Sequence, residues 1–168
     1  MANDDYGKHL AEHVVPAALA LLPGVMDSVP ARRMLLAIAY QESEYRARRQ
    51  IAGWKASQIV YGPARSPWQF ERIGVAGVVE HRATAELYDM VCRRLLYRDT
   101  SAAKIHAAIE HNDVLAAALA RLNLWPDPHP MPDDEAGGWA CYLRVWRPGK
   151  PKPDKWAESW AMALRYAP

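Results

Sequence analysis

One carboxyl group stands out in the sequence because an apolar helical pattern leads directly to it. Leu35, Ile38, Ala39 and Glu42 follow the spacing i, i+3, i+4 and i+7, which places Glu42 at the C-terminal end of an apolar helix face. Partial removal from water disfavours the ionised form of a carboxyl group and raises its pKa. General-acid cleavage of a glycosidic bond needs a group that keeps its proton near neutral pH. The same spacing also allows a purely structural ion pair between Glu42 and Arg46.

Two stretches near the N-terminus carry clear helical periodicity. The first covers about residues 6–21 and contains Pro16, which must kink or interrupt it. The second covers about residues 31–46 and follows Asp27-Ser28-Val29-Pro30, which offers a capping residue and then a proline in the first turn. Glu42 is therefore predicted near the end of this second helix.

Residues 47–67 break the helical pattern with glycines, prolines and mixed polar residues, which is typical of a functional or mobile connection. Helical patterns resume near residue 68 and continue to about residue 166, with proline-rich loops at 125–132 and 148–153. The sequence thus predicts a single all-α domain over residues 1–168, with seven or eight helices.

Composition and charge argue against several classes of protein. The 168 residues have a formal net charge of +2 and no clustered basic stripe, so no nucleic-acid partner is predicted. No apolar stretch is long enough to span a bilayer, so no membrane insertion is predicted, and the acidic N-terminus shows no secretory signal. The two cysteines and six histidines lack the spacing of a metal site, so no metal or other cofactor is expected.

A short motif surrounds the carboxyl group. Gln41-Glu42-Ser43-Glu44-Tyr45 resembles the Glu-Ser signature of lytic transglycosylases in the lysozyme-like superfamily, where an aromatic residue stands two positions after the serine. The resemblance implies a lysozyme-like helical domain in which Glu42 is the catalytic acid and base. It also implies that Ser43 binds substrate and that the helix ends at a substrate cleft.

Two further segments are compared with the same family. Gly62-Pro63-Ala64-Arg65-Ser66-Pro67-Trp68-Gln69-Phe70 resembles its Gly-Ala-x-Gly-Leu-Met-Gln segment, which implies that Gln69 faces the sugar. Pro67 departs from that pattern, because it fixes the backbone where the family has a flexible glycine. The family's Ala-Tyr-Asn-Ala-Gly element is absent in that form, and the nearest candidate contains Tyr142. If it corresponds, the Tyr142 hydroxyl donates toward Glu42 or the substrate; otherwise Tyr142 is a core residue.

Aromatic and basic residues between or beside the two motifs are candidates for binding sugar. Trp68, Tyr61 and Trp54 are flat amphipathic rings, and at least one is predicted to line a sugar groove. Arg65 is predicted to bind a carboxylate of the substrate, since a guanidinium suits planar anions. The alternatives are ring packing for the aromatic residues and a solvated position for Arg65.

The resemblance implies cleavage of the β-1,4 bond between N-acetylmuramic acid and N-acetylglucosamine in peptidoglycan, by a phage-encoded protein. Such a protein acts on the wall after release from the cytoplasm of the producing cell, or as part of a virion. Glu71 could activate a water molecule, which would make the enzyme a hydrolase, as in goose-type lysozymes. The alternative function is an inactive wall-binding or virion structural protein that keeps the fold.

Overall fold

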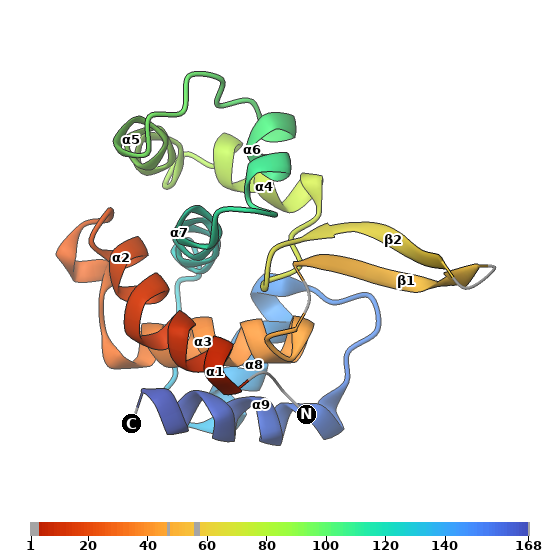
Figure 1. The fold of residues 1–168 in the computed structure, drawn as a ribbon. Helices are drawn as coiled ribbons and strands as arrows, with labels where there is room; N and C mark the ends of the chain where they lie inside the picture. The colour runs from red at the N-terminus through yellow and green to blue at the C-terminus, as the bar shows by residue number, and fades with distance from the viewer. Residues whose placement is uncertain (1–3, 47, 56–57, 168) are drawn as a thin grey trace.

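The computed structural model describes residues 4–46, 48–55 and 58–167, which form a mostly helical body with one two-stranded sheet (Figure 1). No helix in these ranges is long and apolar enough to cross a membrane. The helical elements are α1 (Asp4–His9), the π-helix η1 (Leu10–Val14), α2 (Val15–Leu19), the 3-10 helix η2 (Gly24–Met26), α3 (Val29–Ser43), α4 (Arg72–Glu80), α5 (Ala85–Arg94), α6 (Ala102–Ala108), α7 (Asp113–Leu124), α8 (Glu135–Trp146) and α9 (Pro153–Tyr166).

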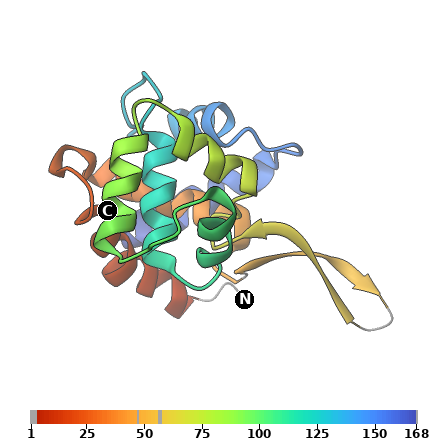
Figure 2. The same cartoon turned by 90° about the horizontal axis from the view of Figure 1, so that it is seen from above.

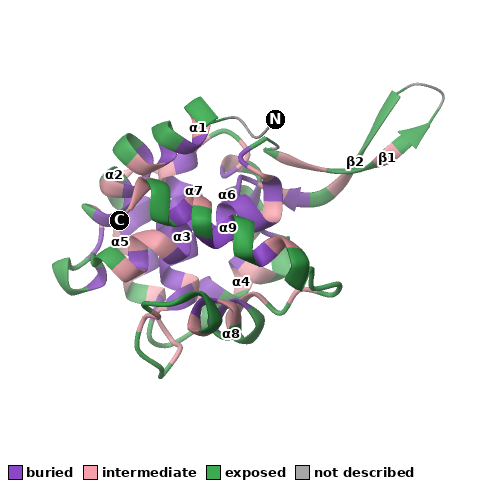
Figure 3. Cartoon of the chain, turned by 90° about the horizontal axis from the view of Figure 1, so that it is seen from below, coloured by how far each residue is buried: buried purple, intermediate pink, exposed green. Residues whose placement is uncertain are grey.

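The prediction of an all-α chain is wrong between α3 and α4, where β1 (Arg49–Lys55) and β2 (Gln58–Arg65) form an antiparallel hairpin. Figures 1 and 2 show the hairpin projecting from the helical body, and Figure 3 shows that its outer part is exposed. A strand with one buried face is recognised by alternating apolar and polar residues. Neither strand has such a face along most of its length, so this signal is missing from the sequence.

The predicted first helix is a path of three successive helical segments, α1, η1 and α2. Pro16 lies in the first turn of α2, where its missing N–H breaks no hydrogen bond. Immediately before it, the Val15 N–H donates to the Leu10 carbonyl five residues back, which is the hydrogen bond of a π-helix. The predicted interruption at Pro16 is therefore a change of helix type.

The helix that carries Glu42 runs through the centre of the body. The predicted cap is confirmed, because the Ser28 side chain accepts from the Ala31 N–H at 3.2 Å. Residues 34–41 are all buried, so α3 is enclosed on most sides rather than on one apolar face. It packs against α7 and α9.

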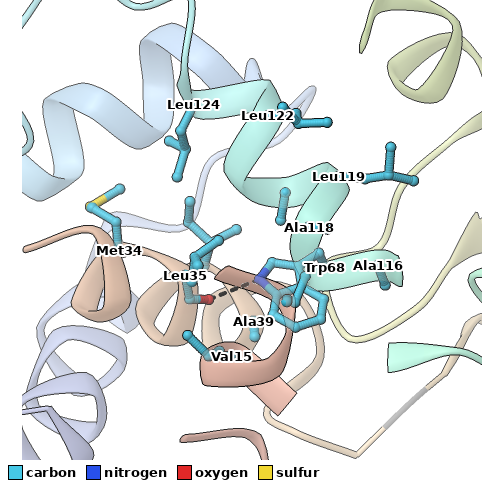
Figure 4. Close-up of a cluster of buried hydrophobic side chains, with 14 of the residues drawn as sticks. Val15, Met34, Leu35, Ala39, Trp68, Ala116, Ala118, Leu119, Leu122 and Leu124 are labelled. Carbon is cyan, nitrogen blue, oxygen red and sulfur yellow. Dashed lines mark hydrogen bonds between the residues drawn. The ribbon is translucent and has the colours of Figure 1, made fainter. Parts of the chain in front are cut away.

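Figure 4 shows the core between α3 and α7, with the Trp68 ring inserted beside them. The Trp68 side chain is 0 % exposed, and its indole N–H donates to the Leu35 carbonyl at 2.9 Å. Burial of the large apolar area of an indole is stabilising, provided that the buried N–H also has a hydrogen-bond acceptor. The chain following β2 is thereby fixed against the side of the central helix.

Candidate active site

A cleft of about 1370 Å³ opens beside the C-terminal end of α3. It is lined by the end of α3, part of the hairpin, the chain leading into α4 and α4 itself, the loop between α7 and α8, the end of α8 and the loop before α9. Glu42, Tyr142 and Arg144 are among the lining residues.

The Glu42 carboxyl group is partly buried and accepts a hydrogen bond of 2.7 Å from the Tyr142 hydroxyl. Burial raises the pKa of Glu42. The Tyr142 hydrogen bond and the charges of Lys155 and Lys152 act in the opposite direction, but burial prevails. Arg46 pairs with Glu44 at 3.2 Å, so the structural ion pair that the spacing allowed with Glu42 is not formed.

Tyr45, the aromatic residue of the motif, fixes the turn that the chain makes after α3. Glu44 and Tyr45 both have left-handed backbones, with φ of 52° and 56°. Such conformations cost energy in residues other than glycine. The Tyr45 ring is 0 % exposed, and its hydroxyl donates to the Leu36 carbonyl at 3.0 Å. The aromatic position of the motif is therefore a buried anchor that reverses the chain two residues after Ser43.

The last turn of α3 is held by α9 and by Lys152, the residue directly before α9. The Gln41 amide donates to the Lys152 carbonyl at 3.1 Å, and its oxygen accepts from the Ser159 hydroxyl at 2.7 Å. Lys155 donates to the Gln41 carbonyl at 2.9 Å and lies 3.2 Å from a carboxylate oxygen of Glu44. A cation near the carbonyl end of a helix is favourable, so these contacts fix the last turn of α3 and bring two lysines close to Glu42.

Ser43 and Gln69, which the resemblance assigns to substrate binding, both line the cleft. The Ser43 hydroxyl donates to the Ala39 carbonyl at 2.8 Å within its own helix. The Gln69 amide donates to the Ser66 carbonyl at 2.7 Å, within the turn that carries it. Both side chains therefore use a donor locally while lying on the cleft wall.

Trp68, Arg65, Tyr61 and Trp54 are not among the residues that line this cleft, so the prediction that at least one of the rings, and Arg65, binds substrate stays a prediction. Trp68 belongs to the core, and Arg65 pairs with Glu110 at 3.2 Å. Tyr61 and Trp54 lie on the hairpin. Residue type cannot separate a ring that packs in a core from one that lines a groove, because both uses need the same apolar area.

Pro67, which stands where the family pattern has a glycine, lies in a tight turn. Residues 65–70 form a tight turn closed by two backbone hydrogen bonds between Arg65 and Phe70, of 2.9 and 2.8 Å. Pro67 is buried in this turn, and Ser66 and Gln69 have positive φ. The turn replaces the flexible loop that a glycine would permit, and it directs Trp68 inward while Gln69 remains at the cleft.

Tyr142 reaches Glu42 because α8 packs closely on α9. The Tyr142 ring stacks on Trp156, with centroids 5.2 Å apart and an interplanar angle of 20°. One turn earlier on the same helix, Gly138 faces Trp160, and a Cβ at this position would lie 2.5 Å from the Trp160 ring. The glycine therefore allows an approach of the two helices that any side chain would prevent.

Nothing in the sequence singles out Asp127, which is one of the residues that line the cleft. Its side chain is 3 % exposed and accepts from Arg144 at 2.5 Å and from His129 Nδ1 at 2.8 Å. Burial alone would raise the pKa of Asp127, but the hydrogen bonds from Arg144 and His129 outweigh it and hold the pKa at about 2. No local pattern links the proline-rich loop to Arg144, which is 17 positions away in the sequence.

The cleft has a positive balance of charge, which favours an anionic ligand. Its acidic side chains are Glu42, Glu44, Glu71 and Asp127, and its basic ones are Arg46, Arg144, Arg147, Lys150, Lys152 and Lys155.

No cluster of three or more histidine, cysteine, aspartate or glutamate side chains suited to a metal ion occurs in the described part of the chain. The chain matches no family model, no curated protein and no solved structure. The function must therefore be argued from the geometry of the site itself.

Proposed function

We propose that this chain is a lysozyme-like glycosidase that cleaves peptidoglycan, with Glu42 as the catalytic acid. The observation that carries the proposal is a partly buried carboxyl group of raised pKa on the wall of a large cleft, in contact with a buried tyrosine hydroxyl. The resemblance of residues 41–45 to the Glu-Ser signature of lytic transglycosylases supports the same assignment.

In this mechanism, protonated Glu42 gives its proton to the oxygen that joins N-acetylmuramic acid to N-acetylglucosamine. The carbon–oxygen bond breaks, the leaving sugar departs as an alcohol, and positive charge develops at the muramyl C1. Ionised Glu42 then takes the proton of the muramyl 6-hydroxyl, whose oxygen attacks C1 and closes a 1,6-anhydro ring. Tyr142 and the charges of Lys155 and Lys152 stabilise the carboxylate that exists between the two proton transfers.

A hydrolytic outcome follows if a water molecule replaces the 6-hydroxyl as the nucleophile. Glu71 lies on the cleft wall at the start of α4 and would be the base that activates this water. The product would then carry a reducing end instead of an anhydro ring. The two outcomes differ by the mass of one water molecule.

The test compares wild type, Glu42→Gln and a matched control, Glu12→Gln, on purified peptidoglycan, with mass spectrometry of the soluble products. Glutamine preserves the shape and the acceptor oxygen of Glu42 but cannot deliver a proton. We expect the first variant to lose about 10²–10⁴-fold in rate. Glu12 is exposed and pairs only with Lys8 across one helical turn among the described residues, so its variant should retain activity. Equal activity in Glu42→Gln and wild type would remove Glu42 from the mechanism.

One observation favours an inactive wall-binding or virion structural protein instead. Trp68 is buried and the Gln69 amide is bonded within its own turn, so the second motif is not arranged like an open sugar-contacting loop. In that case, folded wild type would release nothing from any wall preparation, while still sedimenting with insoluble peptidoglycan. Release of muropeptides would exclude this alternative.

A further inference from the structure

The hairpin carries an apolar stripe that nothing in the described part of the chain covers. Side chains opposite one another in an antiparallel pair lie on the same face. Ile51 is opposite Tyr61 and Trp54 is opposite Ile59, and Ile59 and Tyr61 are two residues apart on one strand. The register of β1 shifts between these two pairs, but Ile59 and Tyr61 lie on one face of β2 and place their partners on that face too. The exposed fractions of Ile51, Tyr61, Trp54 and Ile59 are 53, 49, 69 and 38 %.

The charged residues of the segment that carries this stripe are of one sign. The sequence contains no acidic residue between Glu44 and Glu71. Within the hairpin, neither Arg49 nor Lys55 has an ion-pair partner among the described residues, and the Arg49 guanidinium lies 4.9 Å from the centre of the Tyr61 ring. The projecting element thus combines exposed apolar side chains with cations that no carboxylate neutralises.

We propose that the hairpin docks the protein on an anionic lipid bilayer, with the stripe of Ile51, Trp54, Ile59 and Tyr61 at the boundary between headgroups and acyl chains. Tryptophan and tyrosine favour this boundary because one side of each ring system is apolar and the other bears a hydrogen-bonding group. Lys55 and Arg49 meet the negative surface of the leaflet. The docking is peripheral, so it requires no segment that spans the membrane.

Other occupants of the stripe fit these side chains less well. A glycan strand would match the two aromatic rings, but the branched aliphatic side chains of Ile51 and Ile59 neither stack on sugars nor bond their hydroxyls. A second copy of the same hairpin would bring the unpaired cations of both copies together without any carboxylate between them. A lipid surface meets both the aliphatic area and the positive charge.

The test is flotation of the full chain with vesicles of phosphatidylcholine alone and of phosphatidylcholine with phosphatidylglycerol. We expect wild type to bind the anionic vesicles more tightly, and high salt to weaken this binding. Trp54→Ser combined with Ile59→Ser should reduce binding about tenfold or more, since most of the inserted apolar area is lost. Lys55→Gln should reduce it about fivefold. The control Val25→Ser, at a side chain 74 % exposed on η2, should bind like wild type.

Vesicle binding needs no glycosidase activity, so this proposal does not depend on the function proposed above. Because all the altered side chains are exposed, circular dichroism should show the same fold in every variant. Failure of wild type to bind either vesicle, or equal binding by the double variant, overturns the proposal. Two further results would also overturn it. If wild type binds no vesicle but binds peptidoglycan, and the double variant loses that binding, the stripe binds glycan. If wild type binds no vesicle but sediments as a dimer, and the double variant does not, the stripe binds a second copy.

Discussion

Glu42 and Asp127 are carboxyl groups that line the same cleft, and their surroundings shift their pKa values in opposite directions. Both carboxyl groups are partly shielded from water. Glu42 accepts one hydrogen bond from a neutral hydroxyl and lies near two lysine charges, but burial outweighs these effects and its pKa is raised. Asp127 receives hydrogen bonds from Arg144 and His129, and its pKa is held at about 2.

The comparison shows that burial alone does not assign a role to an acidic residue. A direct guanidinium partner keeps Asp127 ionised at every pH at which the protein is expected to function, so it cannot act as an acid there. Its contribution is to hold Arg144 at the cleft. Glu42 lacks such a partner, and a raised pKa is what its proposed role as the acid requires.

The largest expected effect comes from replacing Trp68, which is hydrogen-bonded to both α3 and α8. Trp68 donates to the Leu35 carbonyl of α3, and its own carbonyl accepts from Trp146 of α8 at 3.2 Å. Trp68→Ala should lower the free energy of unfolding by about 3–5 kcal/mol. Trp54→Ala, on the exposed hairpin, should change it by no more than about 0.5 kcal/mol. Denaturant titration of both variants checks this, and similar losses would contradict the assignment of Trp68 to the core.

Asp127→Asn should be the next in size. It leaves the Arg144 guanidinium without its carboxylate, and we expect a loss of about 1–3 kcal/mol in unfolding free energy near neutral pH. Because the pKa of Asp127 is lowered, its stabilising effect is present above about pH 3.8 and is lost as the pH falls toward 2. Thermal unfolding across this range should therefore show the gap to wild type closing in acid. The exposed Asp133→Asn should show no such gap.

Tyr142→Phe tests the hydrogen bond that moderates the shift at Glu42. Its loss should cost about 0.5–1.5 kcal/mol of stability. It should also raise the pKa of Glu42 further, because the hydrogen bond from Tyr142 lowers it. An enzyme that needs protonated Glu42 loses activity as the pH rises through this pKa, so the alkaline limb of the rate profile should move to higher pH. Tyr61→Phe is the matched control on the hairpin, and its limb should not move.

The smallest expected effect is a gain. Ionised Glu42 is disfavoured in the folded state, so Glu42→Gln should be more stable than wild type at neutral pH. The difference should vanish below about pH 4.5, where Glu42 is protonated in both the folded and the unfolded chain. A rise in melting temperature of about 2–4 °C would correspond to 1 kcal/mol in a chain of this size. A variant less stable than wild type at pH 7 would show that Glu42 is a stabilising ion.

The sequence predicted the features that depend on neighbours along one helix. The cap at Ser28 and the position of Glu42 near the end of α3 follow from spacing within a few residues, and the structure contains both. The cap of α7 shows the limit of such reasoning. Asp113 begins this helix and is a common capping residue, but the side chain that caps is Asn112, which accepts from the Leu115 N–H, while Asp113 binds Arg48 at 2.6 Å. A capping side chain can be recognised locally, whereas a competing distant partner cannot.

The features that the sequence did not predict all depend on distant contacts or on their absence. The role of Asp127 depends on Arg144, which α8 places beside it. The hairpin has no burial pattern because most of it contacts nothing else in the described chain. The position of Trp68 in the core depends on its hydrogen bond to Leu35, which lies far from it in the sequence. Tyr142 is intermediate, since the family resemblance suggested a contact with Glu42 that residue spacing could not supply.

Gly138 gives the site a means of adjustment that lies away from any substrate. It lies four residues before Tyr142 on α8, against Trp160 of α9, where a Cβ would have no room. The spacing of these two helices sets how closely the Tyr142 hydroxyl approaches Glu42. The proton affinity of Glu42 is thus tied to a packing distance, so substitutions at Gly138 or Trp160 would shift the pKa of Glu42 while leaving Glu42 and Tyr142 themselves unchanged.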